Sequence, residues 1–428
     1  MSLLYDISFI IFSVFYLPYF LISGKWRGFS LQRLGIYPKE ILSGLKDTNP
    51  IWIHAVSVGE VMATVPLYEE IKKRYPSENV VVSTVTSTGY RIALDKFGSR
   101  SVVIYLPLDF SFIVNRVIKM INPKAILIAE TEVWPNLINS LKLYGAKIVL
   151  FNGRISKGSF RRYMLIVPIL RRVLDKFNLF LMQSNADAEK IISLGASKDK
   201  VRITGNLKYD AAFLSGEGQK PNPAELRKRF GLGEEDKLFI AGSTHNGEEK
   251  IILRCYKELV KEHPQLRLLI APRRIERAND IVKLAKGQGF DAVLISQTED
   301  LRKQIRQDEI LILDVMGMLS GVYSIGEVIF IGGSLVKKGG HNPLEAAYHS
   351  KAIIFGPHTH NFKDITEELL SNQASIEVKD EMELKNSIIR LLDNQGERKA
   401  IGEKAKATSY SNIGVVKRDL EFIEAIIF

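Results

Sequence analysis

Residues 52–60 (WIHAVSVGE) combine a buried strand with an acidic side chain, Glu60, at the point where a helix should begin. A carboxylate in the first turn of a helix lies near free backbone N–H groups, which lower its pKa, whereas burial in a cleft raises the pKa. Glu60 therefore fits two roles: a general base, or a first-turn residue that complements the helix dipole. The segment lacks G-x-G-x-x-G and does not predict a dinucleotide site.

Two further carboxylates, Glu130 and Glu132, leave the end of an apolar run in the sequence AETEVWPN. Because doubly wound domains present ligand-binding groups where their strands end, one of the two is predicted to be functional. In the alternative interpretation, one of them caps the helix that Pro135 begins. Lys208, in the sequence GNLKYD, follows another strand and could meet an anionic substrate group or serve the structure alone.

The second half of the chain contains residues suited to a nucleotide. Arg273 and Arg274 end an apolar strand, and guanidinium groups make bidentate contacts with phosphates. Residues 339–345 (GGHNPLE) open a helix after two glycines, so exposed N–H groups there favour a phosphate, and Glu345 could accept hydrogen bonds from ribose hydroxyls. The alternative is a glycine-rich turn without a ligand. Residues 241–247 (AGSTHNG) leave the same two interpretations open.

The elements that position these groups alternate between β-branched runs and amphipathic stretches of helix length. This pattern predicts βα repeats around parallel sheets. Strands are expected at 51–56, 80–85, 101–106, 125–130, 147–151, 179–183 and 201–204, and again at 238–241, 266–271, 292–295, 310–313, 328–332 and 352–355. The fold class is therefore α/β, with two doubly wound, Rossmann-like domains facing a cleft. The expected parts are an anchor with a basic flank (1–40), an N-terminal domain (41–212), a linker (213–225) and a C-terminal domain with closing helices (226–428).

The N-terminal segment from Ile7 to Gly24 has 18 residues without a charge. A helix of that length reaches roughly 27 Å, close to the hydrocarbon core of about 30 Å. Asp6 precedes the run, and Lys25 and Arg27 follow it, which is the reverse of a secretory signal. We expect an uncleaved anchor helix of the inner membrane that leaves the remaining chain in the cytoplasm, with an interfacial or a core helix as alternatives.

The charge balance points to anionic partners. The formal net charge is +11, and the one cysteine, Cys255, excludes a disulfide framework and a cysteine-based metal site. Residues 157–177 combine basic side chains, among them Arg161, Arg162, Arg171, Arg172 and Lys176, with an apolar centre, as in a helix on anionic headgroups, although a core helix with basic ends fits the same pattern. No nucleic-acid-binding signature is present.

Taken together, these segments resemble the 3-deoxy-D-manno-octulosonic acid (Kdo) transferases of lipopolysaccharide synthesis. The fragments HAVSVGE, AETEVWPNL, GNLKYD, APRR and GGSLVKKGGHNPLEAA occur in order and are followed by GPHTHNFKD, so the resemblance covers nearly the whole chain. It implies a GT-B fold in which the C-terminal domain binds CMP-Kdo. It further implies an inverting, metal-independent transfer, without a cofactor, to a lipid A precursor that approaches the N-terminal domain at the membrane.

The resemblance also assigns site residues. Glu60 matches the family's catalytic base, and Glu130 and Lys208 match residues that support the transition state. The positions that match CMP-binding residues are Pro272, Arg273, Met316, Gly317, Met318, Asn342, Pro343, Leu344 and Glu345. Met318 stands where the family usually has Glu, so this block loses a carboxylate. His341 is the less favoured ligand of its block, because the glycines and the helix start already explain anion binding.

Two alternatives to a Kdo transferase stay open. One is another GT-B glycosyltransferase, or an epimerase, that uses a UDP-sugar. The other is a non-catalytic, membrane-anchored lipid A binder. The sequence specifies neither the number of Kdo residues transferred nor the oligomeric state.

Overall fold

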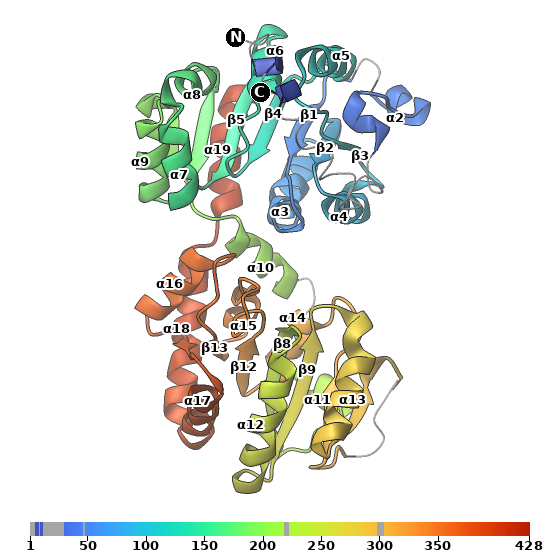
Figure 1. The fold of residues 1–428 in the computed structure, drawn as a ribbon, viewed down its shortest axis with the longest axis vertical. Coiled ribbons are helices and arrows are strands. Elements are labelled where there is room, and N and C mark those ends of the chain that lie inside the picture. Colours follow the sequence, from blue (N-terminus) through green and yellow to red (C-terminus); the bar gives the residue numbers. More distant parts are fainter. Residues whose placement is uncertain (1–4, 8, 12–29, 46–47, 218–221, 298–303) are drawn as a thin grey trace. The chain divides into compact units, whose positions relative to one another are not determined.

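The computed structural model describes residues 5–7, 9–11, 30–45, 48–217, 222–297 and 304–428. The chain forms two compact units (Figure 1). Unit 1 comprises Met1–Ala211 together with Gly414–Phe428, and unit 2 comprises Ala212–Ile413.

Unit 1 is built on a seven-stranded sheet in the order β3-β2-β1-β4-β5-β6-β7, with parallel pairing between all neighbours. The strands are β1 (Ile51–His54), β2 (Val80–Thr84), β3 (Val102–Tyr105), β4 (Ala125–Ala129), β5 (Lys147–Gly153), β6 (Leu179–Met182) and β7 (Val201–Ile203). The helices are η2 (Leu31–Leu34), α2 (Lys39–Ser43), α3 (Val58–Arg74), α4 (Ser87–Phe97), α5 (Ser111–Ile121), α6 (Pro135–Leu143), α7 (Lys157–Met164), α8 (Val167–Leu174), α9 (Asn185–Ser193), η3 (Lys198–Lys200), α10 (Lys208–Glu217), which begins in this unit, and α19 (Val415–Ile427).

The strand order of unit 1 reverses between β1 and β4. Every residue of these two strands is buried, as expected for parallel strands covered by helices on both faces. Such a sheet has its ligand-binding crevice outside the carboxyl ends of the strands, at the point where the order reverses. Glu130 directly follows β4, and Glu60 lies six residues after the last residue of β1, so both carboxylates belong to this point of the sheet.

Unit 2 repeats this architecture in a sheet of the order β10-β11-β9-β8-β12-β13-β14. Its strands are β8 (Lys237–Thr244), β9 (Leu266–Pro272), β10 (Asp291–Leu294), β11 (Glu309–Ile312), β12 (Val328–Ile331), β13 (Ala352–Phe355) and β14 (Ile376–Glu377). Its helices are α11 (Pro223–Arg229), α12 (Glu248–Glu262), η4 (Ile275–Arg277), α13 (Ala278–Gln288), η5 (Ile295–Gln297), α14 (Leu319–Val322), η6 (Tyr323–Ile325), α15 (Leu344–Tyr348), α16 (Lys363–Ser371), α17 (Glu381–Asp393) and α18 (Gln395–Ser411).

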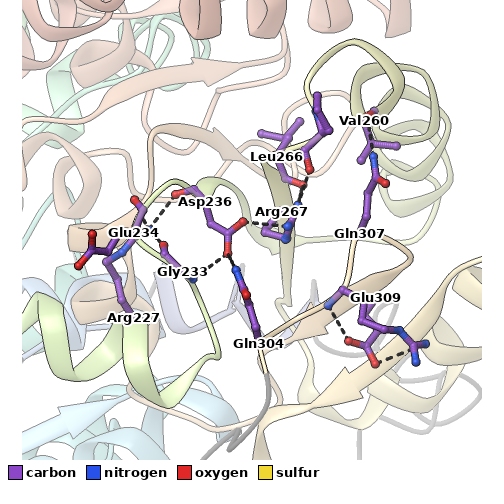
Figure 2. A network of polar contacts seen from close by, with 12 residues as sticks. Arg227, Gly233, Glu234, Asp236, Val260, Leu266, Arg267, Gln304, Gln307 and Glu309 are labelled. Carbon is purple, nitrogen blue, oxygen red and sulfur yellow. Dashed lines mark hydrogen bonds and ion pairs between the residues drawn. The ribbon is translucent and has the colours of Figure 1, made fainter.

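A buried polar network fastens the start of β8 to β9 and to the chain that leads into β11 (Figure 2). The Asp236 carboxylate accepts the Gly233 N–H at 2.7 Å and pairs with the Arg267 guanidinium at 2.8 Å. Gln304 donates a longer hydrogen bond of 3.5 Å to the same carboxylate. Because the Arg267 and Asp236 side chains are only 10% and 4% exposed, each charge is compensated by the other rather than by water.

The expected strands all occur, with ends that differ by a few residues, and the doubly wound α/β class is confirmed. The expected domain boundaries differ from the structure in two places. Helices α10 and α11 occupy most of the predicted linker at 213–225. The last helix, α19, belongs to unit 1 and not to a C-terminal domain of 226–428, because its apolar face, including Leu420 and Ile423, packs into the core of unit 1.

The expected anchor segment lies mostly outside the described residues. Among the residues that the structure does describe, no helix is both long and apolar enough to cross a membrane. The described start of the segment packs on unit 1, where the Asp6 carboxylate accepts the Ser111 N–H at 3.1 Å and the Asn136 side-chain amide at 2.7 Å. The Phe9 ring contacts Phe110 edge-on at a centroid distance of 4.9 Å.

Candidate active site

Glu60 lies in the first turn of α3 and folds back over the helix start. One carboxylate oxygen accepts the Val56 N–H and the other accepts the Ser57 hydroxyl, each at 2.8 Å. A carboxylate offers about four lone-pair sites, so each oxygen can accept a further hydrogen bond. The side chain therefore satisfies groups at the start of the helix, as one interpretation expected, and its free lone pairs remain compatible with the other interpretation, a general base.

The pKa of Glu60 is raised from its usual value to about 7. Burial of the half-buried side chain is the main cause, and the neighbouring Glu130 carboxylate is the second. The hydrogen bonds from Val56 and Ser57 favour the ionised form and oppose this rise without cancelling it. A carboxylate with a pKa near the working pH is suited to general base catalysis, because both of its protonation states are populated.

Glu130 has a backbone conformation that few side chains adopt. Its φ is +56°, in the left-handed region, and its N–H donates to the Phe151 carbonyl on β5 at 3.0 Å. Such a conformation costs about 1–3 kcal/mol for a residue other than glycine and is concentrated at functional sites. The turn directs the chain away from β4 and keeps Glu130 close enough to Glu60 to raise its pKa.

The alternative in which Glu130 or Glu132 caps the helix at Pro135 is wrong. Helix α6 has no side-chain cap from its N-cap residue, Trp134. Instead, the Asp109 carboxylate accepts the N–H groups of Asn136 and Leu137, at 3.1 and 2.8 Å. Both glutamates are thus available for other roles, and burial together with Glu130 raises the pKa of Glu132.

Lys208 reaches the same point of the sheet although it follows β7, three strands away from β4. Asn152 on β5 holds the segment that precedes Lys208. Its side-chain oxygen accepts the Leu207 N–H at 3.0 Å, and the Leu207 side chain is fully buried. The Lys208 ammonium then lies 4.0 Å from a carboxylate oxygen of Glu130. The structure thus brings together all three residues that the resemblance assigned to catalysis.

The residues expected to bind CMP lie on loops at the carboxyl edge of the unit 2 sheet. Pro272 ends β9 and is buried, and the exposed Arg273 follows it, with its N–H donated to the Thr244 carbonyl at 3.0 Å. Met316 is 75% exposed in the loop after β11, Gly317 beside it has a φ of +81°, and Met318 is half-buried. Because β11 and β9 are neighbours, their loops leave the sheet side by side.

The block from Asn342 to Glu345 binds part of its own backbone. The Asn342 side-chain oxygen accepts the Leu344 N–H at 3.1 Å, and its amide group donates to Glu345 at 3.3 Å. Pro343 and Leu344 are buried, and α15 is only five residues long, so its N-terminus offers less to an anion than the sequence led us to expect. Burial raises the pKa of Glu345, while the Asn342 amide and the Arg273 charge oppose the rise.

Within the described residues, no three His, Cys, Asp or Glu side chains come together in a way that could hold a metal ion.

The family model described as 3-Deoxy-D-manno-octulosonic-acid transferase (kdotransferase) matches residues 30–211. A 3-deoxy-D-manno-octulosonic acid transferase of Haemophilus influenzae is 35% identical over 94% of this chain and 92% of its own length. The chain belongs to the Kdo transferase family. It is a glycosyltransferase.

Other similarities agree with this assignment. The Kdo transferase of Aquifex aeolicus is 32% identical over 86% of this chain and 93% of its own length. Among solved structures, the UDP-GlcNAc 2-epimerase of Neisseria meningitidis bound to UDP-GlcNAc matches 88% of this chain and 100% of its own, with a TM-score of 0.60 and 12% identity. That likeness concerns the fold alone and supports the expected GT-B-like architecture.

Sequence reasoning missed the residues that support the candidate catalytic side chains. Asn152 has a φ of +50°, which asparagine tolerates better than most residues, and it follows the apolar run of β5 in an Asn-Gly pair. That pair is a recognisable turn signal. Ser57 and Asp109 carry no such signal, because their roles depend on contacts that only the folded chain makes.

Glu130→Gln should move the pH dependence of Kdo transfer. Glu60 must be ionised to accept a proton, so kcat/KM should rise with pH through about 7 in the wild type. Removing the Glu130 charge lowers the pKa of Glu60. The rise of kcat/KM on the acidic side of the pH profile should therefore move to lower pH, whatever the maximum value of kcat/KM. Glu132→Gln is the matched control. Glu132 raises the pKa of Glu60 less than Glu130 does, so this variant should move the acidic side of the pH profile less. An acidic side that does not move in Glu130→Gln would contradict the coupling.

Proposed function

We propose that the protein transfers Kdo, with inversion, from CMP-Kdo to a lipid A precursor at the cytoplasmic face of the inner membrane, with Glu60 as general base. The single observation that carries the base assignment is the half-buried Glu60 carboxylate, whose pKa is about 7 beside Glu130. The resemblance of the chain to Kdo transferases supports the donor and the acceptor.

The base is needed because a sugar hydroxyl is a poor nucleophile. As the bond from the acceptor oxygen to the anomeric carbon forms, Glu60 accepts the hydroxyl proton, and the bond from that carbon to the CMP oxygen breaks. A positioned base contributes roughly 10²- to 10⁴-fold to the rate. Attack from the face opposite the leaving group gives the inverted product.

Cationic side chains replace a metal ion in this proposal. The CMP leaving group develops negative charge on its phosphate, which the Arg273 guanidinium can match with two N–H groups. Lys208, held 4.0 Å from Glu130, can orient the carboxylate that Kdo itself carries. Because CMP is a good leaving group, these charges suffice, and we expect the rate to be unchanged by a chelator.

Glu60→Gln should abolish Kdo transfer while CMP still binds. Glutamine keeps the shape of the side chain and can contact both Val56 and Ser57, but it cannot accept the proton. The measurement is mass spectrometry of a tetraacylated lipid A precursor after incubation with CMP-Kdo, which also counts the sugars added. Transfer at the wild-type rate would contradict the assignment.

Two controls keep this experiment decisive. Burial raises the pKa of Glu60, so the ionised form of Glu60 lowers the stability of the folded protein above pH 7. At pH 8 the melting temperature of Glu60→Gln should therefore be no lower than that of the wild type. In both proteins CMP should raise the melting temperature more than UMP or UDP does. A preference for UDP would favour the UDP-sugar alternative, and wild-type protein that binds CMP without transfer would favour the non-catalytic binder.

The membrane location is supported by α7 and α8. The predicted helix at 157–177 is broken between them, at Leu165 and Ile166, and the side chains around the break are exposed: Leu165 at 84% and Ile169 at 54%. Exposed arginines flank this apolar surface at 161, 162, 171 and 172, while Leu170 and Val173 on the other face are buried. The surface therefore combines features of both interpretations, a core contact on one side and an exposed basic and apolar face on the other. Basic residues around exposed apolar side chains are typical of an interfacial surface.

The double variant Arg171→Gln/Arg172→Gln should bind anionic vesicles more weakly. Each cation near such a surface contributes about 1 kcal/mol, so the loss of two should weaken binding by roughly 30-fold. Sedimentation with phosphatidylglycerol vesicles at low salt measures it. The matched control is Lys283→Gln/Lys286→Gln, which removes two exposed charges from α13 of unit 2. Equal losses in both variants would contradict a specific role for α7 and α8.

A further inference from the structure

Two histidines of unit 2, His245 and His341, make a contact that the proposed function does not use. Their Nε2 atoms are 2.8 Å apart, and their rings are nearly parallel, with 6° between the planes and 5.1 Å between the centroids. His245 lies in the loop after β8, and His341 lies in the loop between β12 and α15. Because β8 and β12 are neighbours, these loops meet at the carboxyl edge of the sheet, where the expected CMP-binding residues lie.

The backbone around the two rings is built to hold them. Gly333 has a φ of +72°, and a Cβ atom there would lie 3.1 Å from the His341 ring and 3.3 Å from the His245 ring, so another residue would be strained at this position and would press on both rings. The buried Glu248 carboxylate accepts the N–H groups of His245 and Gly333 at 2.9 and 2.7 Å, and those of Ser334 and Leu335 at 3.0 Å. This carboxylate already occupies the N–H groups of residues 333–335, so a phosphate at this point must be recognised by other groups.

The short contact fixes how many hydrogens the rings present. One Nε2 must donate and the other must accept, so one ring is left with a bare Nδ1 and the other carries a hydrogen on Nδ1. Burial and the nearby cations lower the pKa of His245, and burial, Arg273 and His245 lower that of His341 to about 3. At neutral pH the pair is therefore uncharged and offers one N–H donor, which moves to the other ring if both tautomers switch.

The charges that face this pair are mainly positive. Arg273 lowers the pKa of both rings, and Lys338 and Arg277 lower that of His245. The acidic groups nearby are engaged elsewhere: Glu249 pairs with Arg277 at 2.7 Å, Glu345 binds Asn342, and Glu248 binds backbone amides. His360 and the backbone of His358 lie against Gly339 and Gly340 in the same loop. A neutral N–H donor in this setting matches a single oxygen of an anion.

We propose that His245 and His341 form a neutral recognition pair that donates one hydrogen bond to the phosphate of the nucleotide, beside the charge of Arg273. This assigns a role to His341 that the sequence did not favour and adds His245 to the site. The proposal rests on the proposed CMP-sugar donor. Two hydrogen-bonded rings act as a unit, since removing either one leaves the other without the partner that fixes its tautomer.

The test compares CMP with cytidine, which lacks the phosphate, in His245→Asn, His341→Asn and the double variant. A hydrogen bond to a charged group is worth about tenfold or more in affinity, so each single variant should lose that much for CMP and little for cytidine. The double variant should lose scarcely more than either single variant. Isothermal titration calorimetry measures CMP, and ligand-observed NMR measures the weaker cytidine. His263→Asn, paired with Asp393 elsewhere in unit 2, is the matched control and should bind both ligands normally.

The outcomes separate this proposal from the proposed function. Wild-type protein that fails to bind CMP or to transfer Kdo overturns the proposed function. Wild-type protein that binds CMP while the variants lose nothing, or lose CMP and cytidine equally, overturns the recognition pair alone. A loss seen with CMP-Kdo and absent with CMP would assign the pair to the Kdo carboxylate and would also overturn it. His245→Gln, whose amide can still reach the His341 Nε2, should recover part of the CMP affinity, which a merely structural defect would not predict.

Discussion

Electrostatic repulsion between the Glu60 and Glu130 carboxylates is the interaction on which the arrangement of unit 1 depends. Partial burial of Glu60 is the main cause of its raised pKa, and the Glu130 charge makes ionisation of Glu60 more difficult still, so the pKa of Glu60 rises to about 7. The arrangement lasts only because the sheet imposes it. Strands β1 and β4 are neighbours at the point where the strand order reverses, so their carboxyl ends bring the two side chains together.

Residues outside the candidate site stabilise this arrangement. The left-handed backbone of Glu130 is stabilised by its hydrogen bond to Phe151, and the start of α6 is capped by Asp109 rather than by Glu130 or Glu132. Asn152 draws the Lys208 loop over the sheet, so one positive charge stands beside the acidic pair. In unit 2 the Glu248 carboxylate accepts backbone N–H groups of the glycine-rich loop, and burial together with Arg273 keeps the neighbouring His341 uncharged.

The fold was predictable from sequence because most of its strands are short, β-branched and buried on both faces. Glu60, Glu130 and Lys208 stood out because each follows an expected strand, and a resemblance to known transferases ranked them. The last helix was assigned to the wrong unit because an amphipathic pattern shows that a face is buried and not which core buries it. The His245 and His341 contact was also beyond prediction, since it joins residues 96 apart through two irregular loops.

Burial of Glu60 affects both its protonation state and its strength as a base. If the carboxylate were solvated, it would be ionised at every physiological pH and would be a weaker general base. The most direct measurement is the titration of Glu60 itself, by carbonyl-detected NMR of protein with ¹³C-labelled glutamate, with Glu60→Gln identifying the signal. A midpoint near 7 is the expected result. A midpoint near the ordinary 4.5 of glutamate would contradict the account.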